Sequence, residues 1–339
     1  MDTPALRVEV TRGDLVESVH QVTAAVVASD GPLLAAAGDP TRETWWRSAA
    51  KPFQALPLIQ DGVAERFGLG EEDLAFACAS NSSEVKHREA ARRFMDKVGV
   101  TEAQLSCGIH IPLSPVVAHE VACGAATMTP LWSNCAGKHI GMLALARHHG
   151  WPLEGYHVAG HPVQQRILVE IARWSGVAGH DLRQGVDGCT VVCFALPVEA
   201  MARAYSRLAS AEDPALRRVA GAMMRHPMLV GGTGRLCTEL MEALPGRILV
   251  KLGAEGVFCA AIPELGVGVA LKVIDGDTRA SGLALLEVLQ QVFDRLAPSR
   301  SLLVPAPIRA KHGPEPIVNT RNAVTGEMRV TGSLRFFDA

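Results

Sequence analysis

The sequence shows no strong excess of charge of either sign. Its 33 Lys and Arg residues nearly balance its 35 Asp and Glu residues, which leaves a formal net charge of −2. A near-neutral chain gives no electrostatic reason to expect a nucleic acid or an anionic membrane as partner. No apolar run approaches the roughly 20 residues that span a bilayer, because Gly, Pro or charged residues interrupt the richest stretches. We therefore expect neither a nucleic-acid partner nor a membrane partner.

Several common site signatures are also missing. The N-terminal stretch lacks the basic and apolar regions of a secretory signal, so we expect a cytoplasmic protein with mostly reduced cysteines. No two of the eight cysteines form a C-x-x-C pair, and no H-E-x-x-H motif occurs among the 12 histidines. The glycine-rich stretch at 226–241 fits neither a P-loop nor a dinucleotide fingerprint. These absences argue against a zinc finger, a thioredoxin-like protein, a zinc hydrolase that uses metal-bound hydroxide, and a nucleotide site.

What the sequence does contain is strand-like segments near both ends and amphipathic helices between them. Hydrophobic residues make up 48 % of the chain, which is enough for a large core. We expect an α/β protein whose antiparallel sheet is formed by both chain ends, at about 7–40 and 246–335, with covering helices. A mainly helical region should occupy about 48–245. The length allows two domains, but we expect one catalytic domain over 1–339.

Ser48 and Lys51 form the first candidate site, within the stretch WWRSAAKPFQALPL. On a helix, positions three apart share a face, so the hydroxyl and the amine could meet. A lysine can take a serine proton if burial lowers its pKa from about 10.4 toward 7. Trp45, Trp46 and Phe53 could form the desolvating wall. The alternative is an N-capping serine followed by a surface lysine.

Two further segments carry similar residue types. Ser80 opens the stretch SNSSE before a predicted helix, for which the alternative is a capping box. Lys251 stands near the end of a late strand in ILVKLGAEG, for which the alternative is an exposed edge-strand lysine. The order S-x-x-K, S-N-S and K-x-G is similar to the S-x-x-K, S-D-N and K-T-G series of penicilloyl-serine hydrolases.

Cysteines supply a fourth candidate. Cys135 lies in the segment NCAGKHIGML, three residues before Lys138, and Cys189 follows an Asp-Gly turn in GVDGCTVVCFALP. Thiolates are good zinc donors. The alternative is that each cysteine is a buried structural thiol.

Jointly these segments resemble the Rhizobium etli-type (class 3) zinc-containing L-asparaginases, which are related in fold to serine β-lactamases and glutaminases. The resemblance runs from about residue 8 to about residue 333. It rests on RSAAKPFQALPL, ACASNSSE, NCAGKHIGML, GVDGCTVVCFALP, LVGGTGRLCTELM and VKLGAEGVFCAA. It implies a serine β-lactamase-like fold, L-asparaginase activity, a zinc ion and a homodimer.

The resemblance also implies roles for individual residues. Two serine–lysine pairs would be catalytic, three residues would hold zinc together with a water, and four more would lie beside the metal or line the substrate pocket. These sets are Ser48 with Lys51 and Ser80 with Lys251; Cys135, Lys138 and Cys189; and Asn81, His139, Asp187 and Cys237. The family more usually has histidine at position 81 and glycine at position 83. These two departures put the affinity for the substrate, and its identity, in question.

We therefore expect hydrolysis of L-asparagine to L-aspartate and ammonia, with Ser48 as nucleophile and Lys51 as base. One alternative keeps the fold and changes the substrate, as in a glutaminase, a β-lactamase or a peptidase. Another is a non-catalytic metal-binding protein of the same fold. The survival of both serines and both lysines together with the metal-binding set argues against that last alternative.

Overall fold

The computed structural model describes residues 6–29, 31–297 and 302–337. The chain divides into two compact units. The sheet unit contains the residues up to Thr44, Leu196–Ser210 and the residues from Val250 onward, and the helical unit contains Trp45–Ala195 and Ala211–Leu249. That both belong to one catalytic domain stays a prediction.

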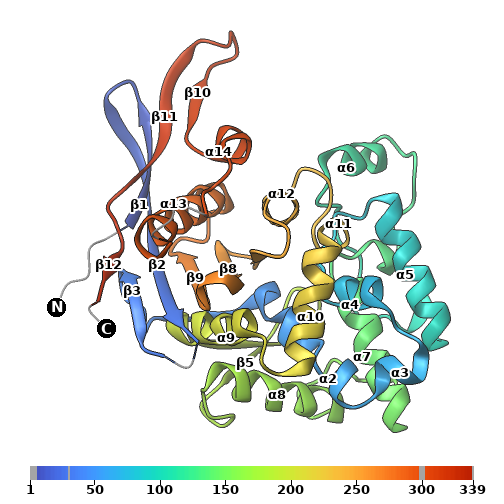
Figure 1. The fold of residues 1–339 in the computed structure, drawn as a ribbon. Helices are drawn as coiled ribbons and strands as arrows, with labels where there is room; N and C mark the ends of the chain where they lie inside the picture. The colour runs from blue at the N-terminus through green and yellow to red at the C-terminus, as the bar shows by residue number, and fades with distance from the viewer. Residues whose placement is uncertain (1–5, 30, 298–301, 338–339) are drawn as a thin grey trace. The chain divides into compact units, whose positions relative to one another are not determined.

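A sheet that joins the two ends of the chain forms the centre of the sheet unit (Figure 1). Its strands pair in the order β10-β11-β1-β2-β9-β8-β7, with β3 beside β2 and β12 beside β3. Strand β1 pairs antiparallel with β11, so that Val8 lies opposite Val330. The strands are β1 Leu6–Arg12, β2 Leu15–Ala28, β3 Leu33–Ala37, β7 Leu249–Leu252, β8 Val257–Ile262, β9 Val267–Val273, β10 Glu315–Val318, β11 Val324–Thr331 and β12 Arg335–Phe336. The predicted sheet of both chain ends is confirmed.

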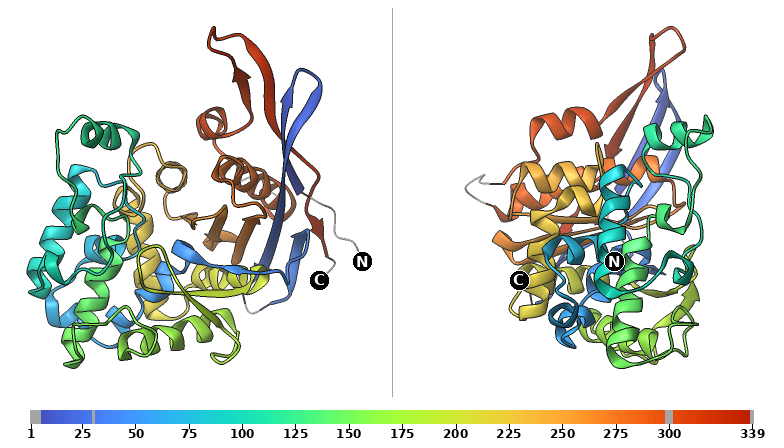
Figure 2. Two further views of the ribbon diagram at one scale, coloured as in Figure 1. Left: turned by 180° about the vertical axis from the view of Figure 1, so that it is seen from behind. Right: turned by 90° about the vertical axis from the view of Figure 1, so that its right-hand side faces the viewer.

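Helices cover this sheet because its central strands are apolar on both faces, and every residue of β8 is buried. Helix α9 (Val198–Ser210) packs against β2, β8 and β9, and α13 (Thr278–Leu296) packs against β1, β8 and β9. Figures 1 and 2 show these two helices on opposite sides of the sheet. Gly268 allows the close approach of α9, since a Cβ there would collide with the backbone of Ala202. Helix α14 (Ala306–His312) packs on α13.

Short helices dominate the helical unit. They are η1 Arg47–Ala50, α1 Lys51–Gln54, α2 Pro57–Gln60, α3 Val63–Phe67, α4 Glu71–Ala77, α5 Val85–Val98, η2 Glu102–Gln104, α6 Pro115–Ala122, η3 Pro130–Trp132, α7 Ala136–His149, α8 Pro162–Ser175, α10 Pro214–Arg225, α11 Pro227–Val230 and α12 Leu236–Ala243. Helix α5 ends at Gly99, whose φ of 73° is left-handed, a conformation that glycine adopts readily. Across the described ranges, no helix has both the length and the apolar composition to cross a bilayer.

A small sheet inside the mainly helical region was not predicted. It pairs β4 (Glu43–Trp45), β6 (Val192–Pro197) and β5 (Arg183–Val186) in the order β4-β6-β5. The N–H of Trp46 donates to the Phe194 carbonyl at 2.9 Å. Strand β6 therefore holds the segment that leads directly into Ser48.

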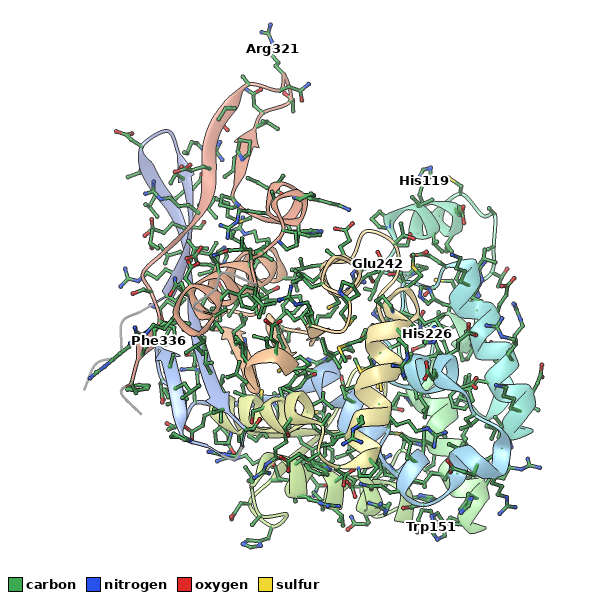
Figure 3. The ribbon with its side chains drawn as sticks, in the orientation of Figure 1. His119, Trp151, His226, Glu242, Arg321 and Phe336 are labelled. Atoms are coloured by element: carbon green, nitrogen blue, oxygen red, sulfur yellow. The ribbon has the colours of Figure 1, made fainter. Side chains whose placement is uncertain are left out.

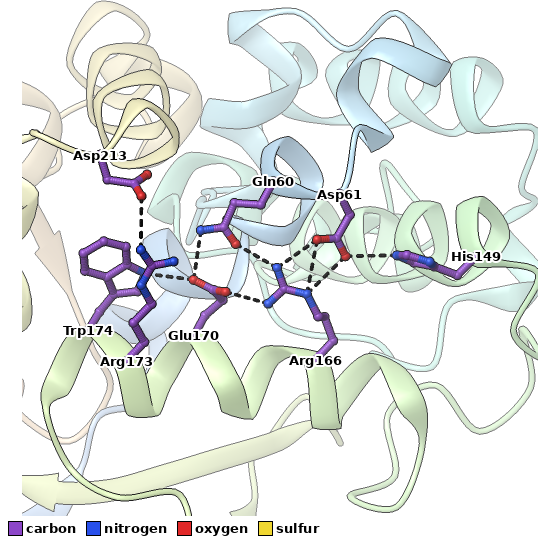
Figure 4. Close-up of polar contacts among 8 residues, drawn as sticks. All are labelled: Gln60, Asp61, His149, Arg166, Glu170, Arg173, Trp174 and Asp213. Atoms are coloured by element: carbon purple, nitrogen blue, oxygen red, sulfur yellow. Dashed lines mark hydrogen bonds and ion pairs between the residues drawn. The ribbon is translucent and has the colours of Figure 1, made fainter.

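Arg166 is the centre of a polar network in the helical unit (Figure 4). Its guanidinium, 22 % exposed, binds Asp61 Oδ1 at 2.8 Å and Glu170 Oε1 at 2.5 Å. It also donates to Gln60 Oε1 at 2.8 Å. Glu170 Oε2 in turn accepts from Trp174 Nε1 at 2.8 Å. The network fastens α8 to the end of α2, and α8 also packs against α1, the helix that begins at Lys51.

Arg166→Ala should destabilise the protein by about 3 kcal/mol, because it leaves two largely buried carboxylates without their main cation. The measurement is urea unfolding at neutral pH. Arg93→Ala is the matched control, since Arg93 pairs with Glu72 through side chains that are 54 % and 57 % exposed. It should cost less than about 1 kcal/mol. Equal losses in the two variants would contradict a structural role for this network.

Candidate active site

Ser48 lies in the short helix η1, directly after a residue with unusual backbone geometry. Arg47 has a φ of 54°, a left-handed conformation that costs a non-glycine residue about 1–2 kcal/mol. Trp46 is fully buried and stacks on Phe53 with ring centroids 5.0 Å apart. These two rings form the predicted apolar wall, whereas Trp45 is 39 % exposed. Ser48 therefore lies, in sequence, between two buried aromatic residues that stack on each other.

Lys51 is fully buried at the start of α1, so the surface-lysine alternative is wrong. Its Nζ lies 2.5 Å from the Ala79 carbonyl oxygen and 3.1 Å from Ser80 Oγ. It also reaches the Asn134 carbonyl oxygen at 3.5 Å. The structure thus brings the lysine of the first predicted pair to the serine of the second.

Ser48 itself is half-buried and is not a helix cap, because η1 begins after Trp46 without a side-chain cap bond. Its carbonyl accepts the backbone N–H of Lys51. Within the part of the chain that the structure describes, its hydroxyl and its backbone N–H have no hydrogen-bond partner. Both groups are therefore open to a ligand, and no direct bond joins the Ser48 hydroxyl to Lys51.

The loop at 80–84 is held by its own side chains. Asn81 Nδ2 donates to the Ser133 carbonyl at 3.2 Å, and Asn81 Oδ1 accepts the N–H of Ser83 at 2.9 Å. Ser83 has a φ of 60°, which is easiest for glycine, the residue more usual at this position in the resembled family. Its hydroxyl donates to the Trp132 carbonyl at 2.6 Å. Asn81 therefore stabilises the loop through both ends of its carboxamide. Its role in substrate binding stays a prediction.

The three predicted metal ligands come together. Lys138 Nζ donates to Cys189 Sγ at 3.1 Å, and the Cys189 thiol is a hydrogen-bonded neighbour of Cys135. All three side chains are buried, with exposures of 4 %, 6 % and 5 % for Lys138, Cys189 and Cys135. Helix α7 supplies Lys138 one residue after Gly137, where a Cβ would collide with the backbone of Phe76.

The electrostatics of this cluster favour a thiolate beside an ammonium ion. Hydrogen bonding from Cys189, together with the charges of Lys51 and Lys138, lowers the pKa of Cys135 well below its usual value. The same hydrogen bond and burial raise the pKa of Cys189. Burial alone would lower the pKa of Lys138, but the charges of the two thiols and of Asp187 raise it above its usual value. The cluster therefore pairs a Cys135 thiolate with a Lys138 ammonium ion, which would have to lose a proton before its nitrogen could bind a metal.

His139 lies beside the cluster and is fully buried. Its Nδ1 lies 2.5 Å from the Tyr156 hydroxyl, which accepts the backbone N–H of Ser106 at 2.9 Å. Burial lowers the pKa of His139 well below its usual value, and the charges of Lys138 and Lys51 add to this effect. The ring is therefore neutral near pH 7.

Asp187 is joined to the residue that precedes Ser48. Its Oδ1 accepts Arg47 Nε at 3.0 Å, and Arg47 Nη2 lies 3.0 Å from the same oxygen. Burial alone would raise the pKa of Asp187, but the charges of Lys138 and Arg47 lower it below its usual range. The Asp187 carboxylate is therefore ionised near pH 7. It interacts with Lys138 of the thiol cluster through charge and with Arg47, the residue before Ser48, through a hydrogen bond.

Two further predicted site residues come from later segments of the chain. Lys251 is on β7 in the sheet unit, where its Nζ donates to the Leu252 carbonyl at 3.0 Å. It is buried, so the exposed edge-strand alternative is wrong. Its pairing with Ser80 stays a prediction. Cys237 is buried on α12, and its place in the pocket also stays a prediction.

Reasoning from the sequence missed two side chains of this site, Arg47 and Tyr156. Arg47 adjoins Ser48, but a single arginine carries no motif, and its left-handed backbone cannot be read from its residue type. Tyr156 lies in a turn-rich stretch after α7 that matches no recognised segment. A buried histidine does need a hydrogen-bond partner, so the one available signal was His139 itself.

Comparison with known proteins identifies a family. The family model described as L-asparaginase II matches residues 8–330. The comparison with curated proteins gives no match.

The solved structures to which the chain is similar at low identity include the following three. Mglu in its native form has 18 % identity over 78 % of this chain and 59 % of that chain, with a TM-score of 0.34. A protein assigned as a β-lactamase from Bacteroides dorei DSM 17855 has 13 % identity over 84 % of this chain and 93 % of that chain, with a TM-score of 0.38. Simvastatin synthase from Aspergillus terreus has 13 % identity over 74 % and 84 %, with a TM-score of 0.34. The chain thus spans about three fifths of the length of Mglu, and its architecture rests on the strand pairing described above.

Thiol labelling should confirm that the cluster is sheltered. Cys123 directly follows α6, and its Sγ lies 3.6 Å from Nε2 of His119, which Figure 3 labels. It is the one exposed cysteine of eight. The native protein should react with one equivalent of a chromogenic disulfide reagent within minutes, and with eight after denaturation, because a buried thiol is not accessible. Cys123→Ser should abolish the fast reaction. Rapid labelling of Cys135 in that variant would contradict the buried cluster.

Proposed function

The chain belongs to the L-asparaginase II family, and we propose that it hydrolyses L-asparagine to L-aspartate and ammonia through a serine nucleophile. One observation carries this proposal. The fully buried amine of Lys51 contacts the Ser80 hydroxyl. Lys51 also lies three residues after Ser48, whose hydroxyl and backbone N–H are open to a ligand. Nucleophile, base and oxyanion donor are the groups that amide hydrolysis by a serine requires. The serine β-lactamase-like character of the fold is part of the proposal.

In the first step, Ser48 Oγ attacks the carboxamide carbon and Lys51 takes the serine proton. The carbonyl oxygen gains negative charge as the tetrahedral intermediate forms. The open backbone N–H of Ser48, at the start of a helix, donates to that oxygen. The buried rings of Trp46 and Phe53 exclude water from the segment that carries Ser48 and Lys51.

In the second step, the proton passes from Lys51 through the Ser80 hydroxyl to the leaving nitrogen. The C–N bond breaks, ammonia leaves, and a β-aspartyl ester remains on Ser48. Water then attacks the ester with Lys51 as base, which releases aspartate and restores the serine. The family resemblance implies that Lys251 pairs with Ser80 and adds positive charge, and this second pair stays a prediction.

The donor set at Cys135, Lys138 and Cys189 fits zinc. Two sulfurs and an amine nitrogen converge in a buried place, and Cys135 is already favoured as a thiolate. Within the described ranges there is no cluster of three or more His, Cys, Asp and Glu side chains for a metal, so the amine is needed to complete the set. Bound zinc would supply a fixed positive charge that orients the amino-acid head group. The homodimer and the cytoplasmic location stay predictions.

Ammonia release from L-asparagine tests this function. Ser48→Ala should lower kcat by about 10³-fold or more, because the nucleophile is lost. Ser175→Ala, which removes a buried hydroxyl bonded within α8, should keep near-normal activity. Near-normal activity in Ser48→Ala would instead point to Ser80. Turnover of glutamine or of a chromogenic β-lactam without turnover of asparagine would favour the alternative hydrolases.

Elemental analysis tests the zinc site. We expect about one zinc per chain in the purified protein and a large loss in Cys135→Ser and Cys189→Ser, because removing a thiolate ligand greatly weakens structural zinc sites. Cys193→Ser is the matched control, since Cys193 is a buried neighbour outside the ligand set. Unchanged zinc in both ligand variants would remove this site from the proposal.

A further inference from the structure

Arg47 is constrained at both its backbone and its side chain. Its φ of 54° is a conformation that a non-glycine residue keeps only where its surroundings hold it. The preceding Trp46 is fixed by its N–H bond to Phe194 and by its stack on Phe53. The guanidinium is fixed by Asp187 across 140 positions of sequence. Such strain at an arginine beside the candidate nucleophile calls for a functional reason.

The hydrogen bonds of Asp187 are unevenly divided between its two oxygens. Oδ1 accepts Arg47 Nε at 3.0 Å and the backbone N–H of Gly188 at 2.7 Å, with Arg47 Nη2 also at 3.0 Å. Oδ2 receives no donor from any residue that the structure describes. The Asp187 side chain is 11 % exposed, and Oδ2 is not one of the fully buried atoms without a partner, so this oxygen is accessible to a ligand.

The charges around this carboxylate also fit a ligand cation. Arg47 neutralises Oδ1 from one side, and Lys138 contributes charge from the thiol cluster. Lys138 is itself bonded to Cys189, so it does not occupy Oδ2. Asparagine brings one cationic group, its α-ammonium, which has three N–H donors.

We propose that Arg47 is a positioning residue: it locks Asp187 Oδ1 so that Oδ2 receives the α-ammonium of the substrate. This inference rests on the proposed function, because it assumes an amino-acid amide at the Ser48 site. It makes the enzyme selective for amides that carry a free α-ammonium. Arg47 acts through Asp187 and does not touch the substrate itself.

Arg47→Gly separates this role from support of the backbone. Glycine adopts a φ of 54° without strain, so the turn can persist while the guanidinium is lost. Arg47→Lys keeps a charge but not the planar fork of donors. Ala211→Gly is the matched control, since Ala211 has a φ of 47° and lies outside the candidate site. The readouts are kcat and KM for L-asparagine and for succinamate, which lacks only the α-ammonium, together with thermal unfolding.

Both Arg47 variants should lower kcat/KM for asparagine by about 100-fold, as expected when a bound group is misplaced. They should change kcat/KM for succinamate less than about 5-fold. Arg47→Gly combined with Asp187→Asn should be no worse than Asp187→Asn alone, because both act through one contact. Ala211→Gly should match the wild type.

The inference is overturned if Arg47→Lys stays within about 3-fold of the wild type on asparagine, if succinamate turnover falls as far as asparagine turnover, or if the two losses multiply. Arg47→Lys keeps the test decisive should Arg47→Gly fail to fold. A wild-type protein that releases no ammonia from L-asparagine would instead refute the proposed function, whatever the Arg47 variants do.

Discussion

The helical unit depends on one constraint: the buried amine of Lys51 must have hydrogen-bond acceptors. Lys51 has no exposed surface, and a buried amine without acceptors would be strongly destabilising. Its acceptors come from the end of α4, from Ser80 and from the segment before α7. Satisfying this one side chain therefore draws together the three stretches that carry Ser48, Ser80 and Cys135. The hydrogen bonds that offset the cost of burying Lys51 are therefore the same contacts that gather the residues proposed for catalysis.

The sheet could be predicted from the sequence because β-branched, apolar strands recur at both ends of the chain with turn residues between them. The small sheet of β4, β5 and β6 could not, because its strands are short and lie among turn residues. The contact of Lys51 with Ser80 was not predicted, since the resemblance pairs Ser80 with Lys251 and no local pattern relates residues 29 positions apart. The left-handed Arg47 and the contact of Tyr156 with His139 depend on tertiary packing and have no local signal.

The loop at 80–84 shows how the chain departs from the resembled family without losing its geometry. Ser83 takes the left-handed conformation that glycine would adopt more easily, and its hydroxyl offsets the strain through the bond to Trp132. Asn81 closes the loop with both ends of its carboxamide. The two departures support one another, because the N–H that Asn81 accepts belongs to Ser83. The differences from the family therefore act as one unit and not as two separate changes.

The pairing of β1 with β11 has a consequence for biosynthesis. Val8 finds its neighbour Val330 only after nearly the whole polypeptide has left the ribosome. Until then the β1 edge of the N-terminal hairpin is open, and before β9 is made the β2 edge that pairs with it is open too. The intervening helices, whose contacts are more local, can already pack. A nascent chain stalled before β11 would expose that edge to other chains. Translation through the last strands thus completes the sheet and closes the period of greatest risk of aggregation.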